Sequence, residues 1–252
     1  MTDFFTEEFS KKLPLLLASL LLFTLTLYTF VTTGIHFASL FNFGSIGQSP
    51  EQLISIQSLL FLIAFSVTLS TSIGFGNKLK MPHAAIPLAL YILIALGSFF
   101  IAPAFLPIFI AFAITFGAAS ILPSTKSESN LASLSKCTNQ ALTLFLIIVV
   151  LFSIVKVELN KTEYVDQFLT GAASLSPQLQ PNAPQQTQNV TLLRSKLSQI
   201  PMFQTLEIFF SIFIALIIFS LISLFNFMVK LISYPINYTI LKLSKLEIEA
   251  KE

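Results

Sequence analysis

Tryptophan is absent from the 252-residue chain, and cysteine occurs once, as Cys137. A single cysteine cannot form an intramolecular disulfide, so cysteine usage indicates no redox compartment. Tryptophan commonly marks the two membrane–water interfaces of a membrane protein. In this chain that aromatic belt would have to come from the five tyrosines and the 27 phenylalanines.

Charged residues are also scarce. They make up 10% of the chain, whereas 54% of the residues are hydrophobic; soluble domains are about one quarter charged. A soluble fold of this length could not keep so much apolar surface away from water. We therefore predict an integral membrane protein whose main partner is the lipid bilayer. The net charge of +2 provides no footprint for a nucleic acid.

The longest stretch without any ionisable residue runs for 42 residues, from Ala84 to Thr125. One helical crossing of a bilayer core about 30 Å thick needs about 20 apolar residues. The stretch is therefore long enough for two crossings, and the sequence Ala-Pro-Ala-Phe-Leu-Pro at 102–107 lies where the chain has to turn.

Apolar segments elsewhere complete an all-α, multi-pass membrane protein of about six transmembrane helices. Their central parts contain no Asp, Glu, Lys or Arg. The predicted spans are 13–37, 53–73, 84–101, 106–122, 138–155 and 206–230, the last with a charge-free core at 208–229.

The distribution of basic residues predicts an orientation with both termini in the cytoplasm, because cytoplasmic loops carry an excess of Lys and Arg. Ten basic residues then lie inside and four outside. The inner ones are Lys11, Lys12, Lys78, Lys80, Lys126, Lys136, Lys230, Lys242, Lys245 and Lys251; the outer ones are Lys156, Lys161, Arg194 and Lys196.

Three segments are predicted to lie outside the bilayer core. Residues 1–12 and 231–252 are expected at the cytoplasmic interface, with Phe9 on the membrane surface and Pro235 ending the sixth helix. Residues 156–205 form the one sizeable external segment. Its centre is rich in Pro, Gln, Ser and Ala and is predicted to be a flexible loop. Its flanks carry helical apolar stripes, which suit either surface helices or extensions of the neighbouring spans.

The lack of ionisable residues within the spans argues against proton- or ion-coupled chemistry in the membrane, since such chemistry depends on groups of this kind. The chain has no Walker loop, GxGxxG, HExxH, GxSxG or CxxC motif. From the sequence we therefore assign no catalytic, cofactor-binding or metal-binding residue.

Hydroxyl side chains in the first two spans are the clearest polar feature within the bilayer. Ser66 and Ser70 are one turn apart and share a helix face, and Thr32 belongs to the hydroxyl set of the first span. They could line a polar path, but the pattern favours helix packing, because hydroxyls bond across helices or back to their own carbonyls.

Small residues in the fourth span suggest close helix packing. Ala113 and Gly117 form a small-xxx-small pair. It suits tight packing of spans three and four on each other, or their packing on a membrane-protein partner. The 156–205 segment is a second candidate for such a contact.

Three further side chains have a functional and a plain interpretation. His36, at the outer end of the first span, would be a pH-sensitive group, although a histidine there more often caps a helix or reaches the interface. His83 is expected in an interfacial cluster with Lys78 and Lys80. Cys137 lies beside Lys136 and suits palmitoylation, although a lone thiol is usually a small packing residue.

These observations favour a non-catalytic accessory, assembly or scaffolding component of a membrane complex. The alternative is a transporter or channel for a small neutral or lipidic solute. An intramembrane enzyme ranks below both. The sequence does not distinguish the cell membrane from an organelle or energy-transducing membrane.

Overall fold

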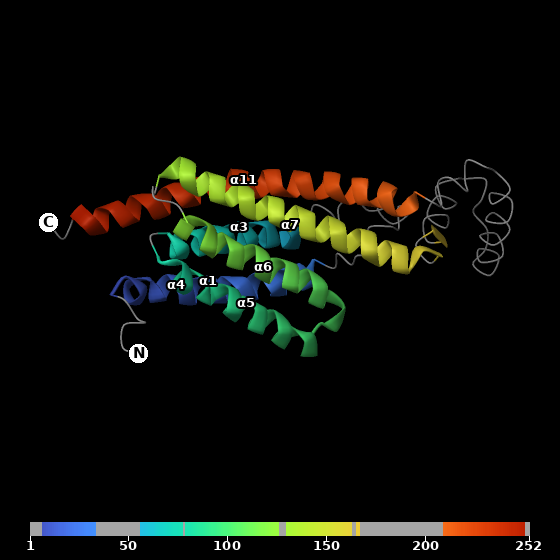
Figure 1. The fold of residues 1–252 in the computed structure, drawn as a ribbon, viewed down its shortest axis with the longest axis horizontal. Coiled ribbons are helices and arrows are strands. Elements are labelled where there is room, and N and C mark those ends of the chain that lie inside the picture. Colours follow the sequence, from blue (N-terminus) through green and yellow to red (C-terminus); the bar gives the residue numbers. More distant parts are fainter. Residues whose placement is uncertain are drawn as a thin grey trace. The chain divides into compact units, whose positions relative to one another are not determined.

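The computed structural model describes residues 7–33, 56–77, 79–125, 130–162, 165–166 and 209–249, with side chains for all of these except 7–8 and 243–249. Every regular element in these ranges is a helix (Figure 1). They form two compact units. The larger unit contains residues 1–33, 57–149 and 222–252, and the smaller unit contains residues 34–56 and 150–221. Each unit is described by itself below.

The helices follow one another along the chain with short connections. The α-helices are α1 (Glu7–Thr32), α3 (Ile56–Gly76), α4 (Met81–Ala84), α5 (Ile86–Gly97), α6 (Leu106–Ile121), α7 (Leu131–Leu159) and α11 (Phe210–Glu249). The 3₁₀ turns are η3 (Ser98–Phe100), η4 (Pro103–Phe105) and η5 (Leu122–Thr125).

Six helical segments are long and apolar enough to cross a membrane, which confirms the predicted all-α class and the number of spans. They are Phe9–Thr32, Ile56–Gly76, Met81–Phe100, Pro103–Thr125, Leu131–Leu159 and Phe210–Lys242. Such a set of helices suits a membrane-embedded protein. The orientation of the helices in the membrane stays a prediction.

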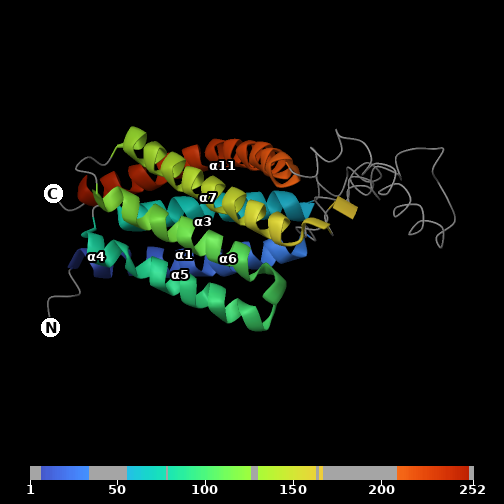
Figure 2. The same ribbon diagram turned by 45° about the vertical axis from the view of Figure 1, so that its right-hand side comes forward.

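The uncharged stretch folds as a hairpin, as predicted (Figures 1 and 2). Proline stands in the first turn of α4, α5, η4 and α6, where its missing N–H costs no helical hydrogen bond. At the tip, the N–H groups of Ile101 and Ala102 donate to the Ser98 carbonyl at 3.0 and 2.9 Å. The side chains of Phe100 and Ile101 are 89% and 86% exposed. We call residues Ser98–Phe105 the hairpin tip.

Pro235 does not end the last helix, so that prediction is wrong. Helix α11 continues through Pro235 to Glu249. A proline inside a helix leaves the carbonyl four residues earlier, that of Leu231, without its N–H partner. Leu231 and Pro235 are both exposed, just beyond the charge-free core of the span. Headgroups or water can reach a carbonyl there, which lowers the cost of the lost bond.

Aromatic rings fill the centre of the larger unit. The Phe65 ring of α3 lies 4.8 Å from the Phe116 ring of α6, 5.5 Å from Phe145 of α7 and 5.1 Å from Phe225 of α11. Phe30 of α1 joins the same group through Phe112, at 5.3 Å. These five helices therefore share one phenylalanine cluster: Phe30, Phe61, Phe65, Phe112, Phe116, Phe145 and Phe225.

The amino-terminal end of α1 packs inside the larger unit. Phe9 is only 3% exposed and makes an edge contact with Phe75 and a tilted contact with His83. His83 is itself 6% exposed. Both side chains therefore lie inside the protein, whereas the sequence suggested the membrane surface for them. Their apolar contacts belong to a small core with Leu16, Leu79 and Ala84.

Candidate functional site

The hydroxyls that suggested a polar path are divided between the interior and the surface. Ser66 and Ser70 of α3 are fully buried, whereas Thr32 is exposed at the end of α1. Thr32 donates to the Thr29 carbonyl at 2.9 Å and Ser66 to the Leu62 carbonyl at 2.8 Å, so both bond back to their own helix. These are the contacts expected from the packing interpretation.

Two hydroxyl pairs do connect helices in the larger unit. Thr26 of α1 and Thr68 of α3 lie 2.9 Å apart through their Oγ1 atoms. Ser72 Oγ of α3 lies 2.7 Å from the hydroxyl of the fully buried Tyr91 on α5. Ser70 differs from these residues, because its Oγ has no hydrogen-bond partner among the described residues.

The predicted small residues Ala113 and Gly117 are both buried in α6. A β-carbon on Gly117 would lie 2.8 Å from the Cα atom of Leu88 on α5. This contact is shorter than side chains tolerate, so the glycine permits close approach within the α5–α6 hairpin. This face of α6 is therefore used inside the chain, in agreement with the first of the two packing alternatives.

His36 lies outside the described residues, as does most of the predicted 156–205 loop. Cys137 is fully buried in α7 and forms no disulfide. Burial places its thiol among packing residues, where an acylating enzyme has no direct access to it.

A polar seam between α7 and α11 was not anticipated. Asn226 Nδ2 donates to the Leu142 carbonyl at 3.0 Å, and Asn237 Nδ2 donates to Thr138 Oγ1 at 3.1 Å. Ser233, between the two asparagines, donates to the Ser66 carbonyl of α3 at 3.4 Å. Asn226, Ser233 and Asn237 are 7% exposed or less, and we call them the polar seam.

The sequence contained a signal for this seam. Its three residues are spaced by seven and four positions, which places them on one face of a helix. Hydrogen bonds between helices in a membrane stabilise by about 0.6–2 kcal/mol each. A search for ionisable residues and for Ser/Thr clusters passes over amide side chains, which is why sequence reasoning missed them.

Lys12 makes a second unanticipated contact. Its Nζ donates to the carbonyls of Gly74 and Phe75 at 3.2 and 3.1 Å, and also to the Asn77 carbonyl. These carbonyls belong to the end of α3, where the last turn lacks N–H partners and the helix dipole is negative. A lysine that the sequence assigned only to the positive-inside count therefore caps a neighbouring helix.

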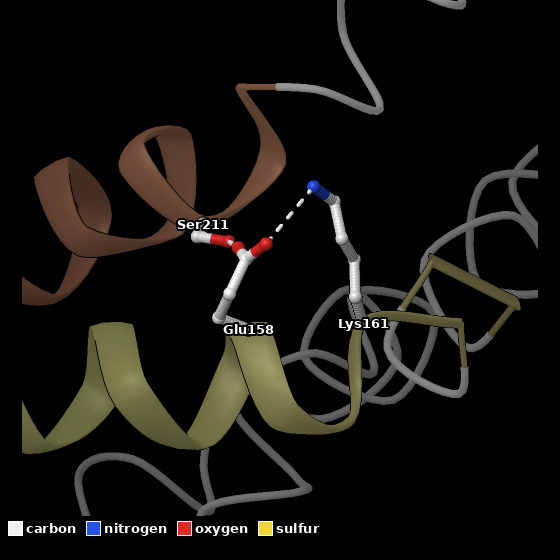
Figure 3. A network of polar contacts seen from close by, with 3 residues as sticks. All are labelled: Glu158, Lys161 and Ser211. Carbon is white, nitrogen blue, oxygen red and sulfur yellow. Dashed lines mark hydrogen bonds and ion pairs between the residues drawn. The ribbon is translucent and has the colours of Figure 1, made fainter.

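The smaller unit contains one polar network (Figure 3). Ser211, at the start of α11, donates to Glu158 Oε2 near the end of α7. On the other side of the carboxylate, Lys161 Nζ lies 3.4 Å from Glu158 Oε1. Glu158 therefore joins α7 to α11 within this unit, at an exposed position where an ion pair stabilises little.

These contacts together form two kinds of arrangement: a phenylalanine interior, and polar groups that join helix to helix. Neither presents a nucleophile with a general base. In a comparison with known proteins, no family model, no curated protein and no solved structure matches this chain.

Proposed function

We propose that this chain is a non-catalytic multi-pass membrane protein, with both termini in the cytoplasm, that serves as an accessory, assembly or scaffolding component of a membrane complex. The observation that carries the proposal is the phenylalanine cluster at the centre of the larger unit. Intramembrane transport and proton relays depend on polar or ionisable groups in such central positions. Here five helices meet through apolar rings.

The outward surface of the α5–α6 hairpin supports a role in assembly. Its buried small residues hold the hairpin together, while Leu93 and Leu96 point outward and are 65% and 46% exposed. An apolar outer face suits contact with lipid or with another membrane protein. The proposed contacts of the chain with a partner are this hairpin face and the 156–205 segment.

Isolation of the native complex tests the proposal directly. The tagged full chain is extracted from its own membranes in a mild detergent, and the co-purifying proteins are quantified. We expect at least one membrane protein at a fixed molar ratio. A clean monomer or a symmetric homo-oligomer would refute the assembly role.

A photo-crosslinking residue at Leu93 locates the contact. We expect an adduct with the same partner from Leu93 and a much weaker one from Leu17, which is 54% exposed on α1. Replacement of residues 171–189 by a Gly-Ser linker of equal length tests the second contact. If both changes leave partner recovery and crosslinking unaltered, the proposed contacts are wrong.

One observation favours the alternative function, a path for a small neutral or lipidic solute. The buried Ser70 hydroxyl has no hydrogen-bond partner within the described ranges, and buried polar groups without a partner are uncommon. A water-accessible path predicts that a Ser70→Cys thiol reacts with a polar thiol reagent. A Ser70→Cys thiol that stays inert from both sides of the membrane removes this support.

A further inference from the structure

A small crevice opens between the first part of α7 and the last part of α11, within the larger unit. Its cavity volume is about 20 Å³. This is enough for one water molecule or one oxygen atom of a larger group. Most of its lining is polar: Ser135, Thr138, Asn139, Lys230, Ser233 and Asn237, with Leu131 and Tyr234.

The position of the crevice along both helices is that of a membrane interface. Lys230 follows directly after the charge-free core of the last span, and Lys136 precedes the charge-free part of α7. Tyr234 and Tyr238 are 55% and 54% exposed on the adjoining turns of α11. Tyrosine and lysine are the residues that gather at headgroup depth. The crevice therefore lies where a protein meets lipid headgroups.

The floor of the crevice contains an amide with unused hydrogen-bonding capacity. Asn237 is 2% exposed, and its Nδ2 donates to Thr138 Oγ1, while its Oδ1 has no partner among the residues described. When the amide turns by 180°, the Thr138 hydroxyl can donate to Oδ1 and leaves Nδ2 as the unpartnered donor. In either orientation one polar atom of a buried side chain lacks a partner, and a bound polar group would supply it.

The rim of the crevice carries a positive charge. Lys230 is exposed, and no described carboxylate lies within ion-pair distance of it. Asn139 and Ser135 add an amide and a hydroxyl beside it. An ammonium group surrounded by hydroxyl and amide donors is the donor set that a phosphate group requires.

We propose that this crevice binds the phosphate of an anionic phospholipid. One phosphate oxygen enters the cavity beside Asn237 and Thr138, and Lys230 pairs with the phosphate from the rim. The acyl chains then run along the exposed apolar surfaces of α7 and α11. Membrane proteins bind anionic headgroups in basic pockets between helices.

Lipid retention in native mass spectrometry tests the proposal with the full chain. The protein is titrated with phosphatidylglycerol and, in parallel, with phosphatidylcholine. We expect tighter binding of phosphatidylglycerol, and about a fivefold loss of affinity in Lys230→Gln, the effect of one lysine near an anionic surface. Lys242→Gln removes the same charge from the same helix outside the crevice and should bind as the unaltered protein does.

The contribution of the buried amide is tested with a matched pair of substitutions. Asn237→Ala should weaken the binding of phosphatidylglycerol, whereas Asn226→Ala, three turns earlier in the same seam, should not. The proposal is overturned if the two phospholipids bind equally, or if Lys242→Gln loses as much affinity as Lys230→Gln. It is also overturned if millimolar inorganic phosphate displaces the lipid, because the site would then hold the free anion.

Discussion

At the scale of single residues, two glycines of the larger unit occupy contacts too close for a β-carbon. A β-carbon on Gly76 of α3 would lie 2.6 Å from the backbone carbonyl carbon of Ser120 on α6, and one on Gly117 would meet the Leu88 backbone. In both cases backbone atoms of another helix occupy the space. They cannot move aside as a flexible side chain can, so each glycine fixes how closely two helices approach.

Gly117→Ala tests this reasoning. We expect a loss of stability of about 1–3 kcal/mol, the usual cost of adding a methyl group to a filled interior. Gly97→Ala is the matched control, because nothing lies within 4 Å of a β-carbon there and alanine is the better helix former. Reaction of the buried Cys137 thiol with a maleimide during heating measures unfolding in detergent. Equal midpoints for the two variants would show that the close contact is unimportant.

At the scale of helices, the phenylalanine cluster explains how the spans are held together without a polar core. Helices in lipid gain no hydrophobic free energy from contact with one another, so their association depends on close packing and hydrogen bonds. Offset and edge-to-face ring pairs stabilise by about 0.5–1.5 kcal/mol each beyond simple burial. The rings of five helices meet at Phe65 and Phe30, and the polar seam adds directed bonds between α7 and α11.

Phe65→Ala is expected to be among the most harmful substitutions in the larger unit. Loss of the central ring leaves a cavity between α3, α6, α7 and α11, and substitutions of this kind cost about 3–5 kcal/mol. Phe100→Ala removes the same atoms at the exposed hairpin tip and should leave the thermal midpoint nearly unchanged. A similar drop for both variants in the Cys137 assay would contradict the proposed role of the cluster.

The helical class, the six spans and the hairpin were predictable because each follows from local composition. A charge-free stretch of known length fixes the number of crossings, and prolines mark the turn. The abundance of phenylalanine was visible too, but not which rings meet, because ring contacts join residues far apart in sequence. For the same reason Lys12 read as a membrane-surface charge, although it caps the end of α3.

At the scale of the whole molecule, the six apolar helices and the ten-to-four distribution of basic residues predict a single orientation. Single-cysteine variants in a Cys137→Ala background test it. A membrane-impermeant maleimide should label Ser45→Cys in intact cells, whereas Ser10→Cys and Thr125→Cys should react only after permeabilisation. The reverse labelling pattern would mean that both termini lie outside.

The hairpin tip has a consequence for how the molecule adapts to different membranes. Its side chains include no ionisable group, and its turn satisfies several backbone N–H groups through its own carbonyls. A segment of this kind loses little when it is drawn below the headgroups. The α5–α6 hairpin is therefore the part best suited to absorb hydrophobic mismatch, since lipids with longer acyl chains can cover a tip that shorter lipids leave in the headgroup layer.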